Sequence, residues 1–342
     1  MVEIVDNELM ELLEKEIKEL LDERKTPKLL YDMMRYHLGW LDVNLRPIEH
    51  YGGKRFRPIF CLLTYYALSG VYDKALPAAA SIELIHNFSL IHDDIEDRDE
   101  ERRHRPTVWK IWGDAQAINA GDGMHVFANL AALRLRKRSV TDSKVVDVLQ
   151  ILNETVMVLC EGQYLDISFE ARTDVTTKEY LDMIRRKTGA LIESAFTVGA
   201  LLATENKRIV DDFRRFGRDF GMAFQIRDDI IGTWCEPEST GKPKGSDIEN
   251  KKKTLPVIYT FENCSDRDRK LLKEVYGKEV LNKKDVKFVI DLMEETGAHA
   301  YSIETAAVYE KNALAALKRL KLSGEAEEKM TALTEFLIKR DY

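Results

Sequence analysis

The sequence has few of the residues that interrupt regular structure: 18 glycines and 8 prolines in 342 residues, against an average of roughly 12% for the two together. A β-sandwich or β-barrel needs many turns between short strands, so this scarcity argues against both. Hydrophobic residues make up 44% of the chain and charged residues 32%. This balance supplies both a buried core and a polar surface, and it excludes an intrinsically disordered protein.

Cysteine pairs, excess positive charge and long apolar runs are also missing. The four cysteines, Cys61, Cys160, Cys235 and Cys264, form no Cys-x-x-Cys pair, which indicates neither a zinc site nor a disulfide framework. A net charge of −7 argues against a protein that coats nucleic acid. No stretch approaches the roughly 18 apolar residues of a membrane span, and the acidic N-terminus does not resemble a signal peptide. We therefore expect a cytoplasmic protein with no transmembrane segment and no nucleic-acid partner.

Hydrophobic residues recur with the 3.6-residue period of amphipathic helices along most of the chain. The stretches that show this period are 8–24, 58–69, 76–92, 115–137, 143–170, 178–203, 207–232, 284–296, 302–321 and 324–339. No stretch alternates with the period of a strand for long enough to predict one. We predict one all-α domain over residues 1–342, with at least ten helices and a small helical subdomain near 235–300.

The polar run 236–253 is the least helical part of the chain. It contains five lysines, two glycines and two prolines. One interpretation is a solvated surface loop. The other is a lid that brings positive charge over a site.

The strongest chemical signal is the run HDDIED at 92–97. On a helix, Asp93 and Asp97 lie one turn apart on one face, and Asp94 lies beside them. Like charges at this spacing repel one another. A cation would relieve the repulsion, and carboxylate oxygens with room for water and phosphate suit Mg²⁺. The alternative is an acidic, solvated face.

A second acidic pair, Asp228 and Asp229, lies in the otherwise apolar stretch FQIRDDIIG. Burying an unpaired carboxylate is costly, so these charges need a partner. The pair Asp211 and Asp212 serves as a comparison, because it is predicted at the start of a helix. Capping and the helix dipole account for acids there.

Cations gather near these acids in several short groups. They are GGKRFRP at 52–58, RRHR at 102–105, Lys187 before Thr188-Gly189, and Lys242 and Lys252 in the polar run. The glycine after Lys187 is predicted to open the backbone of its helix. Together with the acids, these groups fit a site for two polyphosphorylated ligands, one held through Mg²⁺ and one held directly by Arg and Lys.

These segments occur in the order and spacing found in trans-isoprenyl diphosphate synthases, which the chain resembles from about residue 50 to 260. The matching segments are GGKRFRP, ELIHNFSLIHDDIED, RRHRPT, KTG, FQIRDD and GKPKGSDIENKKKTLP, and the final FLIKRDY is similar to the family's basic tail. The resemblance implies an isoprenoid synthase-type helical bundle around a deep central cavity, and a homodimer.

The resemblance also assigns roles to single positions. It implies three Mg²⁺ ions on Asp93, Asp97 and Asp228, with Asp94 and Asp229 in support. For the allylic diphosphate (dimethylallyl, geranyl or farnesyl), it implies Arg102, Lys187, Lys242 and Lys252. For isopentenyl diphosphate, held without metal, it implies Lys54, Arg57, His86 and Arg103. Thr188 and Gln225 would face the allylic carbocation with oxygen dipoles.

Three features bear on how far this resemblance extends. Gly232 stands where many relatives have a third aspartate in the second acidic motif. Phe88 and Ser89 precede the first motif, and Ser89 lies roughly 6 Å from Asp93 along the helix and about 40° around it. A small residue there leaves room for a growing chain, and an aromatic residue at position 88 resembles relatives that stop at geranylgeranyl diphosphate. We predict that C20 product, with farnesyl diphosphate as the alternative. Gln163, Asp166 and Glu170 match a further motif, with either a cavity-lining or a structural role.

Three other functions fit part of the sequence. His86 with His92-Asp93 resembles the pattern of HD-type phosphohydrolases, which leaves the second acidic pair without a role. A terpene cyclase would share the first acidic motif, but its usual second motif is absent at 228–236 and it has no need of GGKRFRP. A non-enzymatic subunit of a heteromeric synthase usually lacks the aspartates, and here both pairs are present.

Overall fold

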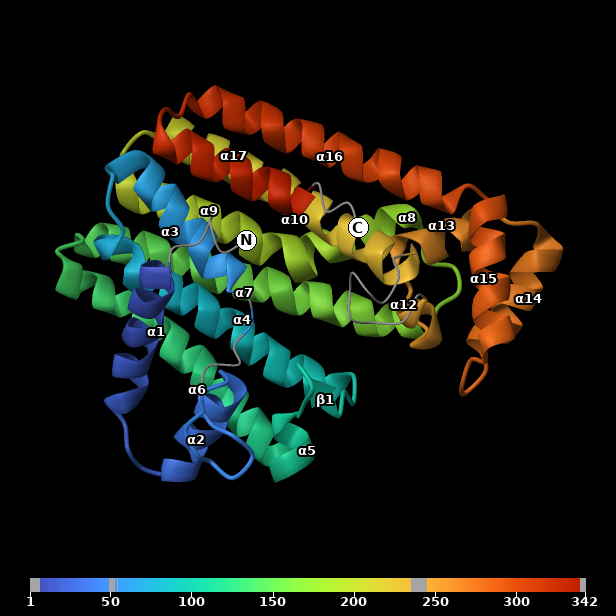
Figure 1. The fold of residues 1–342 in the computed structure, drawn as a ribbon, viewed down its shortest axis with the longest axis horizontal. Coiled ribbons are helices and arrows are strands. Elements are labelled where there is room, and N and C mark those ends of the chain that lie inside the picture. Colours follow the sequence, from blue (N-terminus) through green and yellow to red (C-terminus); the bar gives the residue numbers. More distant parts are fainter. Residues whose placement is uncertain (1–6, 49–52, 54, 235–244, 339–342) are drawn as a thin grey trace. The chain divides into compact units, whose positions relative to one another are not determined.

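Helices make up most of the chain in a computed structural model, which describes residues 7–48, 53, 55–234 and 245–338 (Figure 1). The elements are α1 (Asn7–Asp22), α2 (Lys28–His37), α3 (Phe56–Ser69), η1 (Asp73–Ala75), α4 (Leu76–Glu96), β1 (Glu101–Arg102), β2 (Arg105–Pro106), α5 (Val108–Trp112), α6 (Asp114–Leu133), η2 (Arg134–Arg138), α7 (Asp142–Glu170), α8 (Thr177–Ile184), η3 (Arg185–Gly189), α9 (Ala190–Ala203), α10 (Lys207–Trp234), α12 (Ser246–Glu249), α13 (Leu255–Asn263), α14 (Asp266–Tyr276), α15 (Lys283–Glu295), α16 (Ala298–Leu320) and α17 (Glu325–Ile338). The all-α prediction is confirmed. None of the described helices combines the length and the apolar character that a bilayer span requires.

The described chain divides into two compact units. The first contains the residues up to 156 and 194–210; the second contains 157–193 and 211 onwards. The prediction of one domain over 1–342 stays a prediction.

In the first unit, α4 runs beside α6 (Figure 1). Small residues at 78–81 (AAAS) are all buried, which lets neighbouring helices approach α4 closely. The ring of Phe60 on α3 stacks on Phe196 of α9, with centroids 4.9 Å apart. Gly199 makes this approach possible, because a Cβ there would lie 2.8 Å from the Cβ of Thr64.

The N-terminal helix α1 buries one apolar face in the first unit, including Leu13, Ile17 and Leu21. Its polar face is held by ion pairs. Arg134 of η2 binds Glu16 of this helix at 3.1 Å and Glu23, the residue after its end, at 2.8 Å. The 3.6-residue pattern read from the sequence is therefore the pattern that buries this helix.

The second unit has two apolar clusters. In one, Met222, Ile226 and Ile230 of α10 pack with α8, α13 and α16. In the other, α13, α14 and α15 share a core that includes Val257, Phe261 and Leu272. This second cluster corresponds to the helical region predicted near 235–300. Of the predicted loop 236–253, residues 236–244 lie outside the described residues, and the remainder forms α12 and the turn after it.

The explanation given above for Asp211 and Asp212 is wrong. Helix α10 begins at Lys207, so both acids lie inside the helix and cap nothing. Arg214 donates a hydrogen bond of 2.9 Å to Asp211. Asp212 forms ion pairs with Arg215 at 3.7 Å and with Arg319 at 3.4 Å. Cations one turn ahead or on a neighbouring helix, and not the helix dipole, account for these acids.

Candidate functional site

The first acidic motif lies at the C-terminal end of α4, where the backbone N–H of Asp97 still bonds to the carbonyl of Asp93 at 2.8 Å. Asp93 is half-buried and Asp97 is exposed. Asp94 is buried and accepts a hydrogen bond of 2.6 Å from Nε of Arg102. Burial raises the pKa of Asp94 to about 6, although the neighbouring guanidinium of Arg102 opposes the shift. The three predicted metal ligands of this motif therefore divide into two carboxylates that are at least partly exposed and one buried carboxylate that binds an arginine.

A two-residue hairpin, which the sequence did not predict, follows this motif. Strands β1 and β2 pair antiparallel, with Arg102 opposite Arg105. The turn residues Arg103 and His104 both have positive φ, 53° and 59°. This left-handed conformation is unfavourable for residues other than glycine, so the flanking contacts must enforce it. Among them, Arg105 lies over the ring of Tyr36 at 4.2 Å and donates to that residue's carbonyl.

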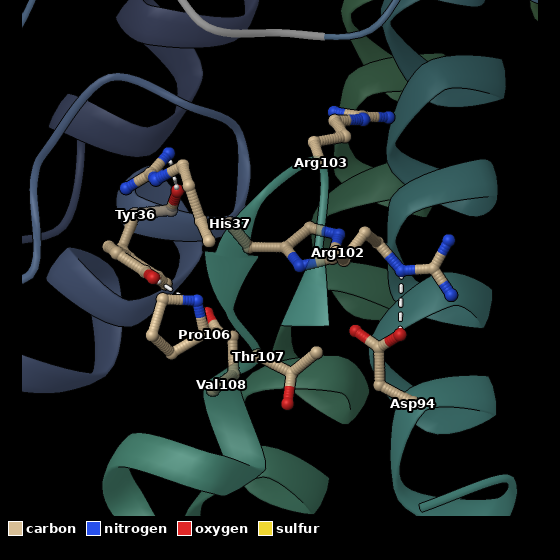
Figure 2. A pocket seen from close by; sticks show the side chains of 9 residues that line it. Tyr36, His37, Asp94, Arg102, Arg103, Pro106, Thr107 and Val108 are labelled. Carbon is tan, nitrogen blue, oxygen red and sulfur yellow. Dashed lines mark hydrogen bonds and ion pairs between the residues drawn. The ribbon is translucent and has the colours of Figure 1, made fainter. Parts of the chain in front are cut away.

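A small pocket lies between this hairpin, α2 and the end of α4 (Figure 2). Its lining consists of Tyr36, His37, Asp94, Arg102, Arg103, Arg105, Pro106, Thr107 and Val108. Nε2 of His37 is buried in the described structure without a hydrogen-bond partner. Burial, Arg103 and Arg102 hold the pKa of His37 well below its ordinary value, so the imidazole is neutral. Helix α2 carries no motif, and sequence reasoning missed His37 and Tyr36.

Three of the four residues predicted to bind isopentenyl diphosphate gather in the first unit. Nη1 of Arg57, on the first turn of α3, lies 3.3 Å from Nε2 of His86 on α4. Burial, Arg57 and Arg103 lower the pKa of His86 well below its ordinary value. Gly53 lies against Arg103, because a Cβ there would be 2.6 Å from Nη2. The fourth residue, Lys54, lies outside the described residues.

The second acidic motif lies on α10. The sequence led us to expect both acids in apolar surroundings, but the structure places only one of them there. Asp228 is exposed, and only Asp229 is buried. Asp229 accepts hydrogen bonds from the hydroxyl of Tyr180 at 2.6 Å, from Nε2 of Gln225 at 3.0 Å and from the backbone N–H of Leu255 at 3.3 Å. Burial raises the pKa of Asp229 to about 7, against the effect of the Tyr180 and Gln225 hydrogen bonds. Tyr180 was not identified from the sequence.

The helix opens at Lys187-Thr188-Gly189, as predicted, because Arg185–Gly189 forms a π-helical turn. Nζ of Lys187 binds Asp166 of α7 at 2.5 Å. The hydroxyl of Thr188 donates to Oε1 of Gln225 at 2.9 Å, which extends the hydrogen-bonded chain to Asp229. Gly162 of α7 permits this arrangement, since a Cβ there would lie 2.7 Å from Cα of Lys187. Of the two roles left open for Asp166, this contact favours a structural one, as the partner of Lys187.

The place of the absent third aspartate at Gly232 is filled by another acid. A Cβ at this glycine would lie 2.7 Å from Cγ of Asp247 on α12. The carboxylate of Asp247 pairs with Nζ of Lys252 at 3.7 Å, and the backbone carbonyl of Asp247 accepts a hydrogen bond of 2.8 Å from the backbone N–H of Lys252. The predicted binding residue Lys242 lies outside the described residues.

The two residues predicted to limit product length are both buried on α4. The ring of Phe88 packs against His125 of α6, with centroids 4.8 Å apart, and against His92 at 5.8 Å. The hydroxyl of Ser89 donates to the carbonyl of His86 at 2.8 Å. His125 was not predicted, and no motif marks it.

The donor chemistry of both motifs fits Mg²⁺. Within the described residues, no three acidic, His or Cys side chains form a metal-binding group. Asp93 and Asp97 in the first unit, and Asp228 in the second, present carboxylate oxygens, the hard ligands that Mg²⁺ prefers. Few protein ligands per motif suit an ion that usually keeps several waters and binds substrate phosphates.

Comparison with known proteins gives the family. A polyprenyl synthetase family model matches residues 39–293. The chain is 39% identical over 302 residues to a short chain isoprenyl diphosphate synthase of Methanothermobacter thermautotrophicus, covering 87% of this chain and 90% of that protein. It is 36% identical over 311 residues to a (2E,6E)-farnesyl diphosphate synthase of Mycobacterium tuberculosis, covering 90% and 85%. The crystal structure of geranylgeranyl pyrophosphate synthetase from Pyrococcus horikoshii matches with a TM-score of 0.88 and 38% identity, over 98% of this chain and 97% of that one. The chain belongs to the polyprenyl synthetase family.

Proposed function

We propose that the protein is a prenyltransferase that condenses isopentenyl diphosphate with an allylic diphosphate, head to tail and in the presence of Mg²⁺. The observation that carries the proposal is the group of Arg57, His86 and Arg103 in the first unit, which shares that unit with the acids Asp93 and Asp97. A phosphohydrolase or a cyclase needs one diphosphate site. Two arginines and a histidine can hold a diphosphate directly, without metal, and so supply the second site that only a condensing enzyme requires.

The cations divide between two diphosphates according to how the protein holds them. Arg57 and Arg103, with His86, bind isopentenyl diphosphate directly. The neutral imidazole of His86 accepts from Arg57, which orients that guanidinium without adding a competing charge. A planar guanidinium presents paired donors to phosphate oxygens, and this favours arginine at such a site.

Three of the four residues proposed for the allylic diphosphate lie among the described residues, and each of the three is paired with an acid. Lys187 binds Asp166, Arg102 binds Asp94, and Lys252 binds Asp247. These pairs orient the cations before substrate binds. Because the positive charges are already in place, little rearrangement is needed when negative charge develops on the diphosphate leaving group. We propose three Mg²⁺ ions, held by the acids Asp93, Asp97 and Asp228, with Asp94 and Asp229 in support. When bound, they neutralise the charge that develops on the departing diphosphate.

Thr188 and Gln225 stabilise the allylic carbocation through their oxygen dipoles. Their mutual hydrogen bond and the bond from Gln225 to Asp229 fix both side chains. The oxygen of Thr188 remains an acceptor while its proton is held by Gln225. Neither group is a strong nucleophile, so the cation persists until the double bond of isopentenyl diphosphate attacks it. Loss of a proton, to the departed diphosphate, completes the product.

We propose geranylgeranyl diphosphate as the product, with farnesyl diphosphate as the alternative. The relatives named above include synthases of both kinds, so the choice rests on this chain's own residues. Ser89 is small and buried, so its side chain takes up little volume on its face of α4. The ring of Phe88 is packed against His125, which makes a rigid stop of the kind that ends elongation.

We further propose a cytoplasmic homodimer. Exposed apolar side chains occur along α6 and α7, and such surface favours association. They are Ile118, Val126 and Leu133 on α6, and Val146, Met157, Tyr164 and Ile167 on α7. Cys61 and Cys264 are free thiols, as is usual in a reducing compartment.

The test is a product analysis with purified protein, labelled isopentenyl diphosphate, Mg²⁺ and each of the three allylic primers. Chromatography of the dephosphorylated products is expected to show the C20 alcohol. Replacing Asp93 or Asp228 with alanine is expected to lower turnover by about 10²–10³-fold or more, because leaving-group charge loses its stabilisation. The matched control Asp211→Ala, on the same helix as Asp228, is expected to change it little. Label-free hydrocarbon from the primer alone would indicate a cyclase, and phosphate release alone would indicate a hydrolase.

A further inference from the structure

We propose that Arg55 is a positioning residue: a buried anchor that fixes Gly53 and Arg57 for binding isopentenyl diphosphate, and not a ligand of that substrate. The inference rests on the proposed function. In the sequence, GGKRFRP contains three cations, and the resemblance assigns substrate binding to Lys54 and Arg57 but no role to Arg55. In the structure, Arg55 is 4% exposed, which separates it from a surface that meets substrate.

The backbone of Arg55 is held in an unfavourable conformation. Its φ is 45° and its ψ is 41°, in the left-handed region, at the residue that precedes α3. Arginine has no preference for this region. Strained residues of this kind persist where the surrounding contacts over-determine them, and such residues cluster at functional sites.

The contacts that enforce this conformation come from three separate segments. Nε of Arg55 pairs with Glu14 of α1 at 2.5 Å, and Nη1 pairs with Glu83 of α4 at 2.5 Å. Nη2 donates to the carbonyl of Leu38, just after α2, at 3.3 Å. Other donors hold the two acids in place, since Trp40 donates to Glu14 at 2.6 Å and Asn87 donates to Glu83 at 2.6 Å. The planar guanidinium of arginine presents donors in several fixed directions and so can contact all three segments, which the single ammonium group of lysine cannot do.

Arg55 is connected to the cations that bind substrate in two ways. Along the chain, Arg55 is two residues from Arg57, which contacts His86, and two residues from Gly53, which lies against Arg103. Through space, burial lowers the pKa of Arg103, and Glu83 is the leading charge that opposes this shift and favours the protonated guanidinium. The N-terminal helix α1, which carries no recognisable motif, thereby contributes Glu14 to the geometry of the substrate site.

The test compares Arg55→Lys with a matched control, Arg134→Lys. Arg134 also binds two acids, Glu16 of α1 and Glu23 just after it, and is largely buried, and within the described residues its ion pairs involve neither Arg57 nor Arg103. We expect Arg55→Lys to raise KM for isopentenyl diphosphate by about tenfold, because small misplacements of binding groups have large kinetic effects. The value of kcat and the KM for the allylic primer should stay within about twofold. Arg134→Lys should leave both KM values unchanged.

Two further measurements keep the test decisive. Titration of inorganic pyrophosphate in EDTA measures metal-free binding without turnover, and Arg55→Lys is expected to weaken it by about tenfold. If Arg55→Lys does not fold, Trp40→Phe, which removes one donor to Glu14, is expected to raise the same KM by about threefold. Equal effects of Arg55→Lys and Arg134→Lys on both substrates, or an unchanged KM for isopentenyl diphosphate in Arg55→Lys, would overturn the proposal. Absence of any condensation by the wild-type protein would instead overturn the proposed function.

Discussion

Adding a side chain at Gly232 is expected to destabilise the second unit, and the effect can be worked out from one contact. A Cβ at this position would lie 2.7 Å from Cγ of Asp247, well inside van der Waals contact. Asp247 has little freedom to withdraw, because its side chain is only 15% exposed and pairs with Lys252. Gly232→Ala therefore overpacks the site, which costs about 1–3 kcal/mol.

Gly232→Asp adds a charge to this steric conflict. Two carboxylates about 4 Å apart repel by about 4 kcal/mol at the effective dielectric constant of a protein surface. Partial exposure of Asp247 and the nearby Lys252 reduce this figure, so we expect a further loss of about 2–4 kcal/mol at neutral pH. The third aspartate common in relatives is thus incompatible with this chain as it stands.

Urea unfolding followed by circular dichroism measures these losses. The double variant Gly232→Asp/Asp247→Gly moves the acid from one position to the other, and it should recover most of the stability lost in Gly232→Asp. This recovery gives the coupling energy between the two positions. A Gly232→Ala variant as stable as the wild type would show that Asp247 does not lie against Gly232, and the reasoning would fail at its first step.

Three other outcomes are expected. The pKa of His37 is depressed below 6.5, so below pH 6.5 the unfolded chain binds a proton that the folded chain does not, and the free energy of unfolding decreases by about 1.4 kcal/mol for each unit that the pH falls. Urea unfolding at pH 5.5 and 7.5 measures the difference in free energy of unfolding between the two pH values, and this difference should be smaller by about that amount in His37→Gln. An equal difference in His37→Gln and the wild type would contradict the assignment. Ser89→Phe should shorten the product, because the ring fills space on the face of α4 toward the metal motif; chromatography showing the same chain length would place the limit elsewhere. Lys187→Ala should lower kcat or raise KM for the allylic substrate, whereas Arg57→Ala should mainly raise KM for isopentenyl diphosphate. Identical kinetic changes in the two variants would show that the cations are not divided between two ligands.

Local pattern was sufficient for much of the fold. Long amphipathic stretches such as 143–170 and 207–232 predicted α7 and α10 nearly to their ends, because one apolar face repeating every 3.6 residues leaves little choice of structure. The opening at Lys187-Thr188-Gly189 was predicted from one glycine, and it is a π-helical turn. Short elements escaped prediction: α5 has five residues and the hairpin after α4 has two residues per strand, too few to establish a period.

The sequence identified many residues of the candidate site but not which of them are buried. Sequence spacing identified Asp228 and Asp229 but assigned burial to both, whereas a helix turns about 100° per residue and only Asp229 faces inward, toward Tyr180. The resemblance assigned roles to Lys54 and Arg57 in GGKRFRP, but nothing in that segment shows that Arg55 between them is buried. His37 carries no motif and joins the basic pocket only because α2 packs there. Contacts between segments distant in sequence decided each of these cases.

The π-helical turn also makes this part of the chain sensitive to changes in length. Lys187 reaches Asp166 on α7 while the next residue, Thr188, reaches Gln225 on α10. Deleting one residue from Arg185 or Arg186 would shift both side chains by one helical position, about 100° around the axis, and neither would then face its partner. Substitutions at the outward positions of the turn preserve the register. Insertions and deletions do not, so homologous chains that keep both contacts must keep the number of residues between α8 and Thr188.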